Sequence, residues 1–262
     1  MNAPDQPFVL REDRDGIATL TMNRGDRFNP LSAGMIAAMV DLLEVIARDS
    51  STRVVILKGG GRGFCAGHDL KEMQANRSEA WWNAMFESCS DLMMRMTQLP
   101  QPVIAQVHGI ATAAGCQLTS MCDLAVAASD AKFALPGVNV GLFCSTPAVG
   151  VARNIGRKRV MEMLLLGEPI TAETALEWGL VNRVVPADRL EAETRHLAER
   201  IASKSAAVIA MGKKAFYQQL DKNLSGAYAM TGDTMACNMQ LADNQEGIDA
   251  FLTKRHPRWV HR

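Results

Sequence analysis

The sequence predicts an α/β fold in which strands and helices alternate before a purely helical C-terminal end. Two apolar runs rich in β-branched residues, at 54–57 and 103–107, each lead into a glycine-rich turn and then a helical pattern. Beyond residue 205 only helical patterns occur. We therefore expect a core over residues 1–200 that carries the functional site and a helical region over residues 201–262.

The charge balance argues against nucleic acid or a membrane surface as a partner. The chain has 28 Lys plus Arg and 28 Asp plus Glu, so its net charge is zero. Its 48% hydrophobic and 21% charged residues are typical of a soluble globular protein. No apolar run is long enough to cross a bilayer, and residues 1–6 have neither the basic segment nor the apolar stretch of a targeting peptide.

Cysteine usage indicates a reducing compartment. The six cysteines form no C-x-x-C pair and have no histidine at a metal-ligand spacing. We therefore expect reduced, buried thiols, no metal site and a cytoplasmic location. The cysteines are Cys65, Cys89, Cys116, Cys122, Cys144 and Cys237.

Apolar periodicity assigns the elements of the first half of the chain. Ser32 can cap a helix whose apolar residues, from Met35 to Ile46, recur at helical spacing. A longer helix carries a stripe of methionines, more typical of a core than of a ligand platform, and ends before Pro100. In order, we expect strands at 8–11 and 17–22, a helix from 32 to about 49, a strand at 54–57, a helical start at 70–73, a helix at 79–98, a strand at 103–107, a short helix at 113–121, and strands at 123–128 and 132–134.

After Pro147 the chain is helical apart from one short extended stretch. The apolar residues of the last helices exceed what a small appendage needs to cover, which favours a closed symmetric oligomer. The expected helices are at 151–155, 159–166, 172–178, 187–204, 206–220, 224–242 and 244–253, and the extended stretch is at 179–185.

Two glycine-punctuated turns carry the strongest functional signal. The first, Gly61 to Lys71, follows the strand at 54–57, and the second, His108 to Leu118, follows the strand at 103–107. A turn from a strand into a helix leaves unpaired backbone N–H groups that favour negative charge. One such turn is an ordinary connection. Two of them can direct two N–H donors at one oxygen, which makes an oxyanion hole.

These turns resemble the two signature regions of the crotonase superfamily, the enoyl-CoA hydratase/isomerase family. The matching segments are Phe64 to Leu70 and Ala113 to Asp123, and the similarity extends from Leu20 to Arg255. The run at 135–147 most resembles the enoyl-CoA hydratase domain-containing protein 3 branch. The resemblance implies the crotonase (ClpP/crotonase-like) fold, a spiral of ββα units with a C-terminal helical trimerisation region, and hence a homotrimer or homohexamer.

The resemblance also implies a substrate and a binding site. Crotonase-like enzymes bind acyl-CoA thioesters and stabilise an enolate at the thioester oxygen, with no cofactor beyond the coenzyme A of the substrate. The two backbone donors correspond to His68 and Ala114, and each donor of this kind contributes on the order of 3 kcal/mol. The residues that the resemblance places against the substrate are Arg24, Arg27, Phe28, Ala66, Asp69, Leu70, Lys71, Cys144, Phe251 and Lys254; each can also be read as a surface charge or a packed apolar residue.

Two of these positions have competing interpretations. The carboxylate of Asp69 is more simply a helix cap than a base, and Asp123 is likewise more simply a structural hydrogen-bonding residue. The ring of His68 either packs beside the coenzyme A chain or tunes the site, because imidazole titrates near neutrality. Methylmalonyl-CoA decarboxylase-like members of the family also have histidine at this position.

The acid–base residues of hydratases are missing. In the relatives, one glutamate activates the water and a second exchanges a proton at the α-carbon; the corresponding positions are Gln117 and Gly137. An amide does not accept a proton usefully, and glycine only leaves space for a bulkier substrate or a water. Cys144, Ser145 or the His68 ring can substitute. Restoring both glutamates together should raise hydration more than either change alone.

The sequence therefore predicts an acyl-CoA thioester enzyme of this family that lacks both usual glutamates and is nominally an enoyl-CoA hydratase in fatty-acid metabolism. Two alternatives stay open. One is a decarboxylase of a malonyl-type CoA, in which loss of CO₂ itself generates the enolate. The other is a non-catalytic acyl-CoA-binding protein.

Overall fold

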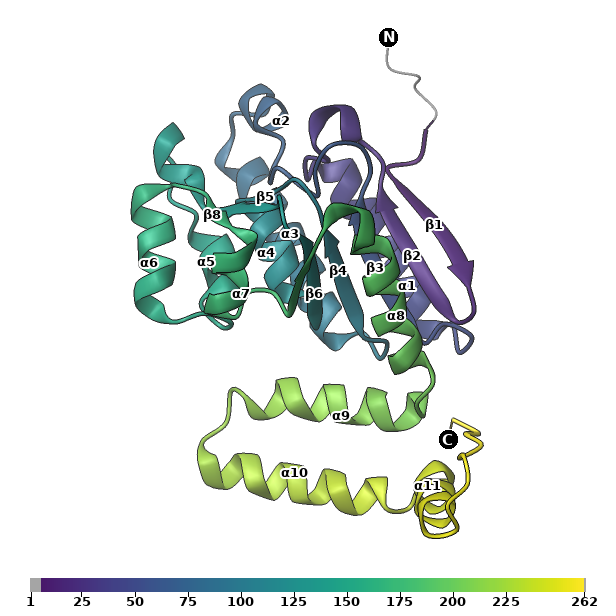
Figure 1. Cartoon of the computed structure of the whole chain (residues 1–262). Coiled ribbons are helices and arrows are strands. Elements are labelled where there is room, and N and C mark those ends of the chain that lie inside the picture. Colours follow the sequence, from purple (N-terminus) through teal and green to yellow (C-terminus); the bar gives the residue numbers. More distant parts are fainter. Residues whose placement is uncertain (1–5, 262) are drawn as a thin grey trace.

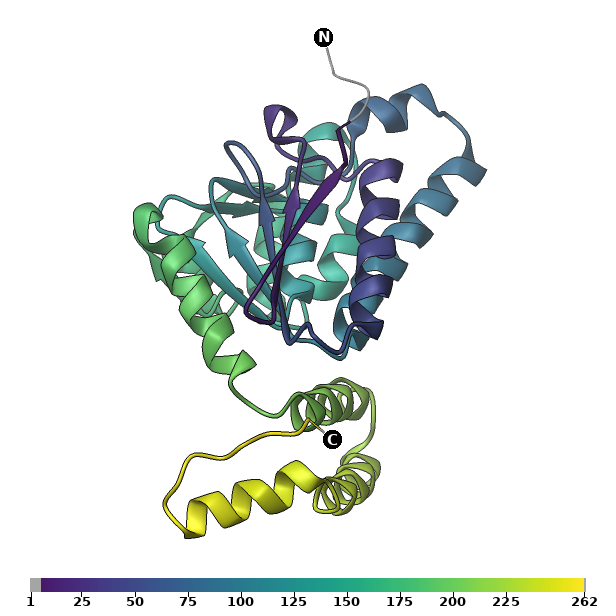
Figure 2. The same cartoon turned by 90° about the vertical axis from the view of Figure 1, so that its right-hand side faces the viewer.

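The core of the molecule is a six-stranded sheet covered on both faces by helices, and three further helices lie beyond one end of it (Figures 1 and 2). The computed structural model describes residues 6–261. Residues 1–5, on which the expectation about a targeting peptide mostly rests, and residue 262 lie outside the described residues. Within residues 6–261, no helix combines the length and the hydropathy needed to cross a membrane.

The sheet brings the two glycine turns together. Its order is β1-β2-β3-β4-β6-β9, and only the β1–β2 pair is antiparallel. Because β3 and β4 are parallel neighbours, the turns that leave their carboxyl ends emerge side by side. The strands are β1 (Val9–Arg14), β2 (Ile17–Met22), β3 (Val54–Gly59), β4 (Val103–Val107), β6 (Leu124–Ala128) and β9 (Arg183–Val185), with a smaller sheet of β5 (Ile110–Thr112), β7 (Lys132–Ala134) and β8 (Ile170–Thr171).

Helices on the two faces of the sheet bury separate apolar clusters. On one face α1 (Ala33–Arg48), α3 (Glu79–Gln98) and α4 (Ala114–Met121) enclose the main core, and on the other α8 (Leu190–Ala202) covers a smaller one (Figure 2). Ser32 caps α1 as predicted, accepting a hydrogen bond from Met35 N–H. The remaining helical elements of the core are η1 (Gly25–Arg27), α2 (Leu70–Ala75), η2 (Pro136–Val140), α5 (Ser145–Val151), α6 (Arg157–Leu166), α7 (Ala172–Trp178) and η3 (Ala187–Arg189).

Three expectations about local structure are corrected. The helix expected at 151–155 does not form: residues 152–155 form turns, and the helix here is α5, which begins at Ser145 and ends at Val151. Pro147 falls within its first turn, where proline is tolerated. The helix expected at 187–204 is a 3₁₀ turn followed by α8, which ends at Ala202. Cys237 is exposed, although the other five cysteines are buried as predicted.

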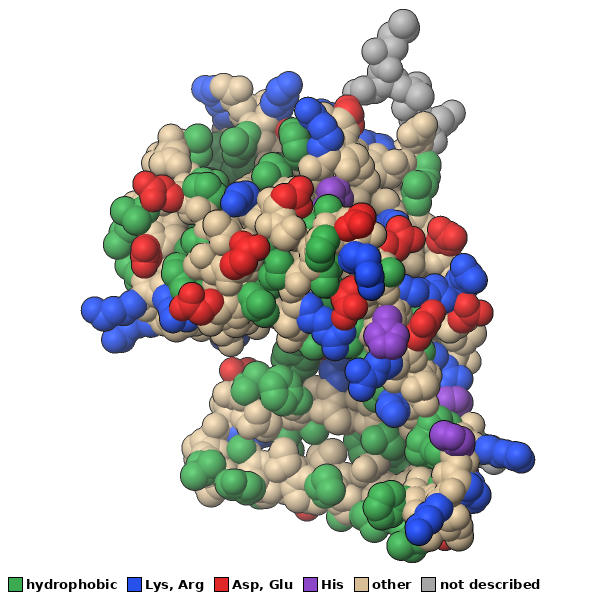
Figure 3. Space-filling model, in the orientation of Figure 1, with side chains coloured by type: hydrophobic (Ala, Val, Ile, Leu, Met, Phe, Trp, Pro, Cys, Tyr) green, Lys and Arg blue, Asp and Glu red, His purple; other side chains and the backbone are tan. Residues whose placement is uncertain are grey.

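The C-terminal helices are confirmed and leave much apolar surface uncovered. α9 (Ala206–Gln219), α10 (Leu224–Asn238) and α11 (Ala242–Leu252) lie below the core in Figure 1. α10 has no buried residue. Hydrophobic side chains are exposed along these helices (Figure 3), including Phe216, Leu220, Leu224, Tyr228, Met235 and Met239.

Lys213 of α9 anchors these helices to the core. Its Nζ donates to Asp123 Oδ2 at 2.7 Å and to the carbonyl oxygens of Met96 at 2.9 Å and Gln101 at 3.0 Å. The other oxygen of Asp123 accepts from the Tyr217 hydroxyl at 2.9 Å. Asp123 is therefore a structural hydrogen-bonding residue, as the sequence predicted.

Lys213→Met is expected to lower the free energy of unfolding by about 3–5 kcal/mol, because it leaves the carboxylate of Asp123 without its cation in a largely buried position. The matched control is Lys214→Met, at the next and exposed position, with an expected change below about 0.5 kcal/mol. Denaturant unfolding of the three proteins at one concentration measures the difference. Equal stability of the two variants would refute an anchoring role.

Candidate functional site

The two signature turns are hydrogen-bonded to each other. Cys65 N–H donates to the carbonyl of Ile110 at 3.0 Å, and Thr112 N–H donates to the carbonyl of Cys65 at 2.9 Å. A Cβ on Gly115 would lie 2.1 Å from the carbonyl oxygen of Cys65, so this close approach requires glycine. The sequence segments that carry the family resemblance therefore form one structural unit.

Two backbone N–H groups of this unit are left without acceptors. The carbonyl of Gly67 and the N–H of Asp69 both bond to Leu31, so the N–H of His68, between them, points the other way. Ala114 is the first residue of α4 and has no carbonyl one turn earlier to bond. Neither N–H has an acceptor among residues 6–261. The nitrogen of Ala114 lies 3.2 Å from where a Cβ of Gly67 would stand, which brings the two turns into contact at this point.

The two helices that follow the turns differ at their N-termini. Asp69 caps α2, as predicted, because its carboxylate accepts from Lys71 N–H at 3.0 Å and Glu72 N–H at 3.2 Å. Those donors are therefore unavailable to a ligand. Ala113, with φ of 50° and no side-chain cap, precedes α4 and leaves the N–H of Ala114 free of any capping group. The available donors are thus one N–H from a loop and one from a helix start.

A cavity of about 420 Å³ opens beside these turns. Its walls are mostly apolar, and Arg27 and Lys71 lie exposed at its edge. The sequence motifs did not identify all of the lining residues. Several of the residues that they missed belong to the run at 135–147 that carries the branch resemblance. The lining comprises Arg27, Pro30, Ala66, His68, Asp69, Leu70, Lys71, Met73, Ala113, Pro136, Gly137, Asn139, Val140, Leu142 and Cys144.

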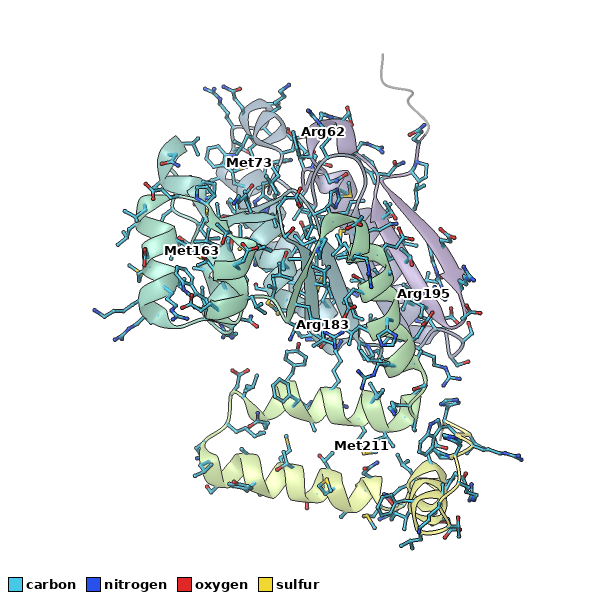
Figure 4. All side chains as sticks on the ribbon, in the orientation of Figure 1. Arg62, Met73, Met163, Arg183, Arg195 and Met211 are labelled. Atoms are coloured by element: carbon cyan, nitrogen blue, oxygen red, sulfur yellow. The ribbon has the colours of Figure 1, made fainter. Side chains whose placement is uncertain are left out.

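Four of the residues expected against the substrate do not line this cavity. The guanidinium of Arg24 lies over the ring of Phe8, 4.1 Å from its centroid, and Phe28 stacks in the same way under Arg62 at 5.0 Å. Phe251 and Lys254 lie at the end of α11. That helix lies at the opposite end of the molecule from α2, as the labels of α2 and α11 in Figure 1 and of Met73 on α2 in Figure 4 show. Within one chain, Phe251 and Lys254 therefore do not reach the cavity.

The ring of His68 is neutral at pH 7. It packs edge-on against Phe86, with ring centroids 5.5 Å apart and an interplanar angle of 84°. Burial lowers the pKa of His68 to about 4, and its buried Nε2 has no hydrogen-bond partner among residues 6–261. Of the two interpretations of this ring, the one that depends on titration near neutrality is disfavoured, because desolvation destabilises the imidazolium.

This burial makes stability depend on pH. The folded-state pKa of His68 is about 4 against an ordinary value of 6.5, so as the pH falls from 7 the unfolded state takes up a proton first and folding is weakened. At about 1.4 kcal/mol per pH unit, the free energy of unfolding should fall by about 3 kcal/mol down to pH 4 through this group. His68→Phe should remove that part of the decline. Denaturant unfolding of both proteins at pH 7 and pH 4 tests it, and equal slopes would contradict it.

The positions of the two missing glutamates, Gln117 and Gly137, are both closely surrounded by other parts of the chain. Gln117 is buried, with 4% exposure, and its Oε1 has no partner among residues 6–261. A Cβ on Gly137 would lie 2.1 Å from the carbonyl oxygen of Leu142 and 2.8 Å from Sγ of Cys144. The space expected beside Gly137 is therefore filled by this chain's own loop. This corrects the idea that glycine there leaves room for substrate.

Of the groups that can replace a glutamate, two reach the cavity. His68 and Cys144 line it, whereas Ser145 is exposed and does not. Burial raises the pKa of the Cys144 thiol, and the backbone of Gly137 offsets part of that rise. At neutral pH both groups are uncharged.

Relatives of known sequence agree with the motif assignment. The chain is 45% identical over 248 residues to a Rattus norvegicus protein named enoyl-CoA hydratase domain-containing protein 3, mitochondrial, covering 95% of this chain and 83% of the relative. The mouse, frog and human proteins of that name match similarly. These relatives overturn the expected cytoplasmic location, since all are named mitochondrial. Free thiols indicate a reducing environment without saying which compartment provides it.

Solved structures agree with the fold. The chain superposes on an enoyl-CoA hydratase from Mycobacterium smegmatis with a TM-score of 0.95 and 50% identity, covering 97% of this chain and 99% of that one. The human enoyl-CoA hydratase domain-containing protein 3 gives a TM-score of 0.91 and 44% identity, covering 97% and 100%. The enoyl-CoA hydratase/isomerase sequence profile matches residues 12–262. The predicted crotonase fold and branch resemblance are confirmed, and the chain belongs to the enoyl-CoA hydratase/isomerase family.

Proposed function

We propose that the chain binds an acyl-CoA thioester with the thioester oxygen between the N–H groups of His68 and Ala114. The supporting observation is that both N–H groups lack an acceptor where the two signature turns meet, beside the cavity. Negative charge that develops on the oxygen as an enolate forms is stabilised by these fixed donors. The reaction class is therefore enolate chemistry of the enoyl-CoA hydratase/isomerase type in fatty-acyl-CoA metabolism. No cofactor is needed beyond the coenzyme A of the substrate.

The charges around the cavity suit this orientation. Arg27 and Lys71 at the exposed edge favour the anionic coenzyme A portion. The inner groups, His68 and Cys144, are neutral at pH 7 and suit an uncharged acyl chain. Hydration is the nominal activity, but it is expected to be slow because neither Gln117 nor Gly137 provides a base.

Decarboxylation of a malonyl-type CoA is the second candidate. The observation that favours it is that Asp69 is the only carboxylate residue in the cavity lining, within residues 6–261. A substrate carboxylate beside His68 and Cys144 would meet neutral side chains, and loss of CO₂ generates the enolate without a base. Asp69 lines the cavity, but its carboxylate already holds the start of α2.

Binding and turnover separate these functions. Calorimetric titration with butyryl-CoA tests the site, and turnover assays with crotonyl-CoA and methylmalonyl-CoA test the two reactions. We expect saturable binding and turnover of at least one thioester. Saturable binding without turnover of any thioester would favour the non-catalytic role, and failure to bind coenzyme A esters would refute the site.

We also propose that the chain assembles as a homotrimer or a homohexamer. The 15-residue helix α10 buries none of its residues within one chain, so its apolar face needs a partner surface. In such an assembly, Phe251 and Lys254 could contact the cavity of a neighbouring subunit, whereas they do not line the cavity of their own chain. Light scattering should give three or six times 28.5 kDa. A monomeric mass at micromolar concentration would refute this assembly.

A further inference from the structure

We propose that Cys144 is the catalytic residue that exchanges a proton with the α-carbon of the bound thioester. The inference rests on the proposed function, since it assumes an acyl-CoA in the cavity with its enolate oxygen at His68 and Ala114. It restricts the substrates to thioesters that carry a hydrogen at the α-carbon or gain one in the reaction.

Cys144 lies next to the position that a side chain at residue 137 would take. Its Sγ lies 2.8 Å from the position that a Cβ of Gly137 would take, and the Cys144 side chain lines the cavity. The residue is 6% exposed, so the sulfur is largely shielded from bulk water but keeps some access to solvent through the cavity. A group that itself carries a proton therefore lies beside the position of the expected second acid.

The other polar groups of the cavity are less suited to this step. Arg27 and Lys71 lie at the exposed edge, and the amide of Asn139, which donates to the carbonyl of Gly167 at 3.2 Å, is not an acid. The neutral His68 ring has an unpartnered, buried Nε2. That nitrogen indicates that a polar group of a ligand belongs in this part of the cavity. With a pKa of about 4 the His68 ring carries no second proton at pH 7 to give away.

The backbone supports the charge that the step creates. The backbone of Gly137 lowers the pKa of the Cys144 thiol and so favours the thiolate form, while burial raises that pKa and favours the thiol. The thiol is thus the resting form, and the backbone of Gly137 offsets part of the cost of the thiolate that remains after proton transfer.

The step balances without any further reactant. When an enolate is quenched, the S–H bond of Cys144 breaks and its proton forms a C–H bond at the α-carbon. The enolate electron pair makes that bond as the thioester carbonyl re-forms. The thiolate then regains a proton from solvent. In reverse, the thiol first loses its proton to solvent. The resulting thiolate removes an α-proton, and the oxygen of the enolate accepts hydrogen bonds from the N–H groups of His68 and Ala114.

Hydrogen–deuterium exchange of butyryl-CoA tests the reverse step without depending on hydration. The protein is incubated with butyryl-CoA in D₂O, and deuterium at the α-carbon is measured by mass spectrometry. We expect exchange by the wild-type chain and a fall of about 100-fold or more in Cys144→Ala. Cys144→Ser keeps the size of the side chain with a far weaker acid and should also lose exchange. It serves as the second variant if Cys144→Ala does not fold. Ser145→Ala, at the exposed neighbour, is the matched control and should exchange like wild type.

Binding of butyryl-CoA to each variant is measured by calorimetry alongside exchange. Loss of exchange in the Cys144 variants with binding retained supports the assignment. Binding without exchange by the wild-type chain, or exchange that survives in Cys144→Ala and Cys144→Ser, overturns this inference and leaves the proposed function standing. If the wild-type chain does not bind butyryl-CoA, the proposed function fails and this inference fails with it.

Discussion

Ala114→Pro is expected to reduce turnover of the best thioester substrate by about 10²- to 10³-fold while the protein still folds. Proline removes the N–H of Ala114, one of the two donors proposed for the thioester oxygen. The first position of a helix tolerates proline, since its N–H has no helical acceptor there. Because the lost interaction strengthens as the enolate forms, kcat should fall more than the affinity for substrate.

The matched control is Glu79→Pro, which removes the N–H at the first position of α3, an exposed site outside the cavity lining. It should leave turnover unchanged. Thermal unfolding of both variants checks that Ala114→Pro is folded. A folded Ala114→Pro with full activity would show that the oxyanion donors have been assigned wrongly.

The wild-type chain is expected to hydrate crotonyl-CoA about 10²- to 10⁴-fold more slowly, for each missing group, than a family member that carries both glutamates. Gln117 can orient a water but cannot deprotonate it. Gln117→Glu puts a carboxylate into nearly the same buried volume, where desolvation raises its pKa toward that of a useful base. The change should raise hydration by up to about 10²-fold.

Adding Gly137→Glu should bring no further gain, contrary to the expectation from sequence. Its Cβ would lie 2.1 Å from the carbonyl oxygen of Leu142, so the loop that carries Cys144 must move. Even Gly137→Ala should lower the melting temperature, since overpacking of this kind costs about 1–3 kcal/mol. A stable double variant that hydrates crotonyl-CoA faster than Gln117→Glu would show that the loop yields. Brisk hydration by the wild-type chain, unaffected by Cys144→Ala, Ser145→Ala or His68→Ala, would refute the whole account of proton transfer.

The site was predictable as far as short sequence segments determine it. Both turns lie within about ten residues of the strands that precede them, so glycine spacing and apolar runs were sufficient to find them. The cap functions of Ser32 and Asp69 were predictable for the same reason, because a capping side chain bonds to N–H groups only two or three residues away. The helices of the last sixty residues likewise followed from local periodicity.

The amino-acid sequence by itself thus determined most of the order of strands and helices, although not β5 or β8, together with the two turns that belong together and the lack of glutamate at 117 and 137. Tertiary structure alone decided what surrounds those positions. The Leu142 carbonyl fills the space at Gly137, Cys144 reaches the cavity while Ser145 does not, and burial lowers the pKa of His68. Each of these depends on contacts between segments that the chain path brings together, and desolvation and steric exclusion act through space rather than along the sequence.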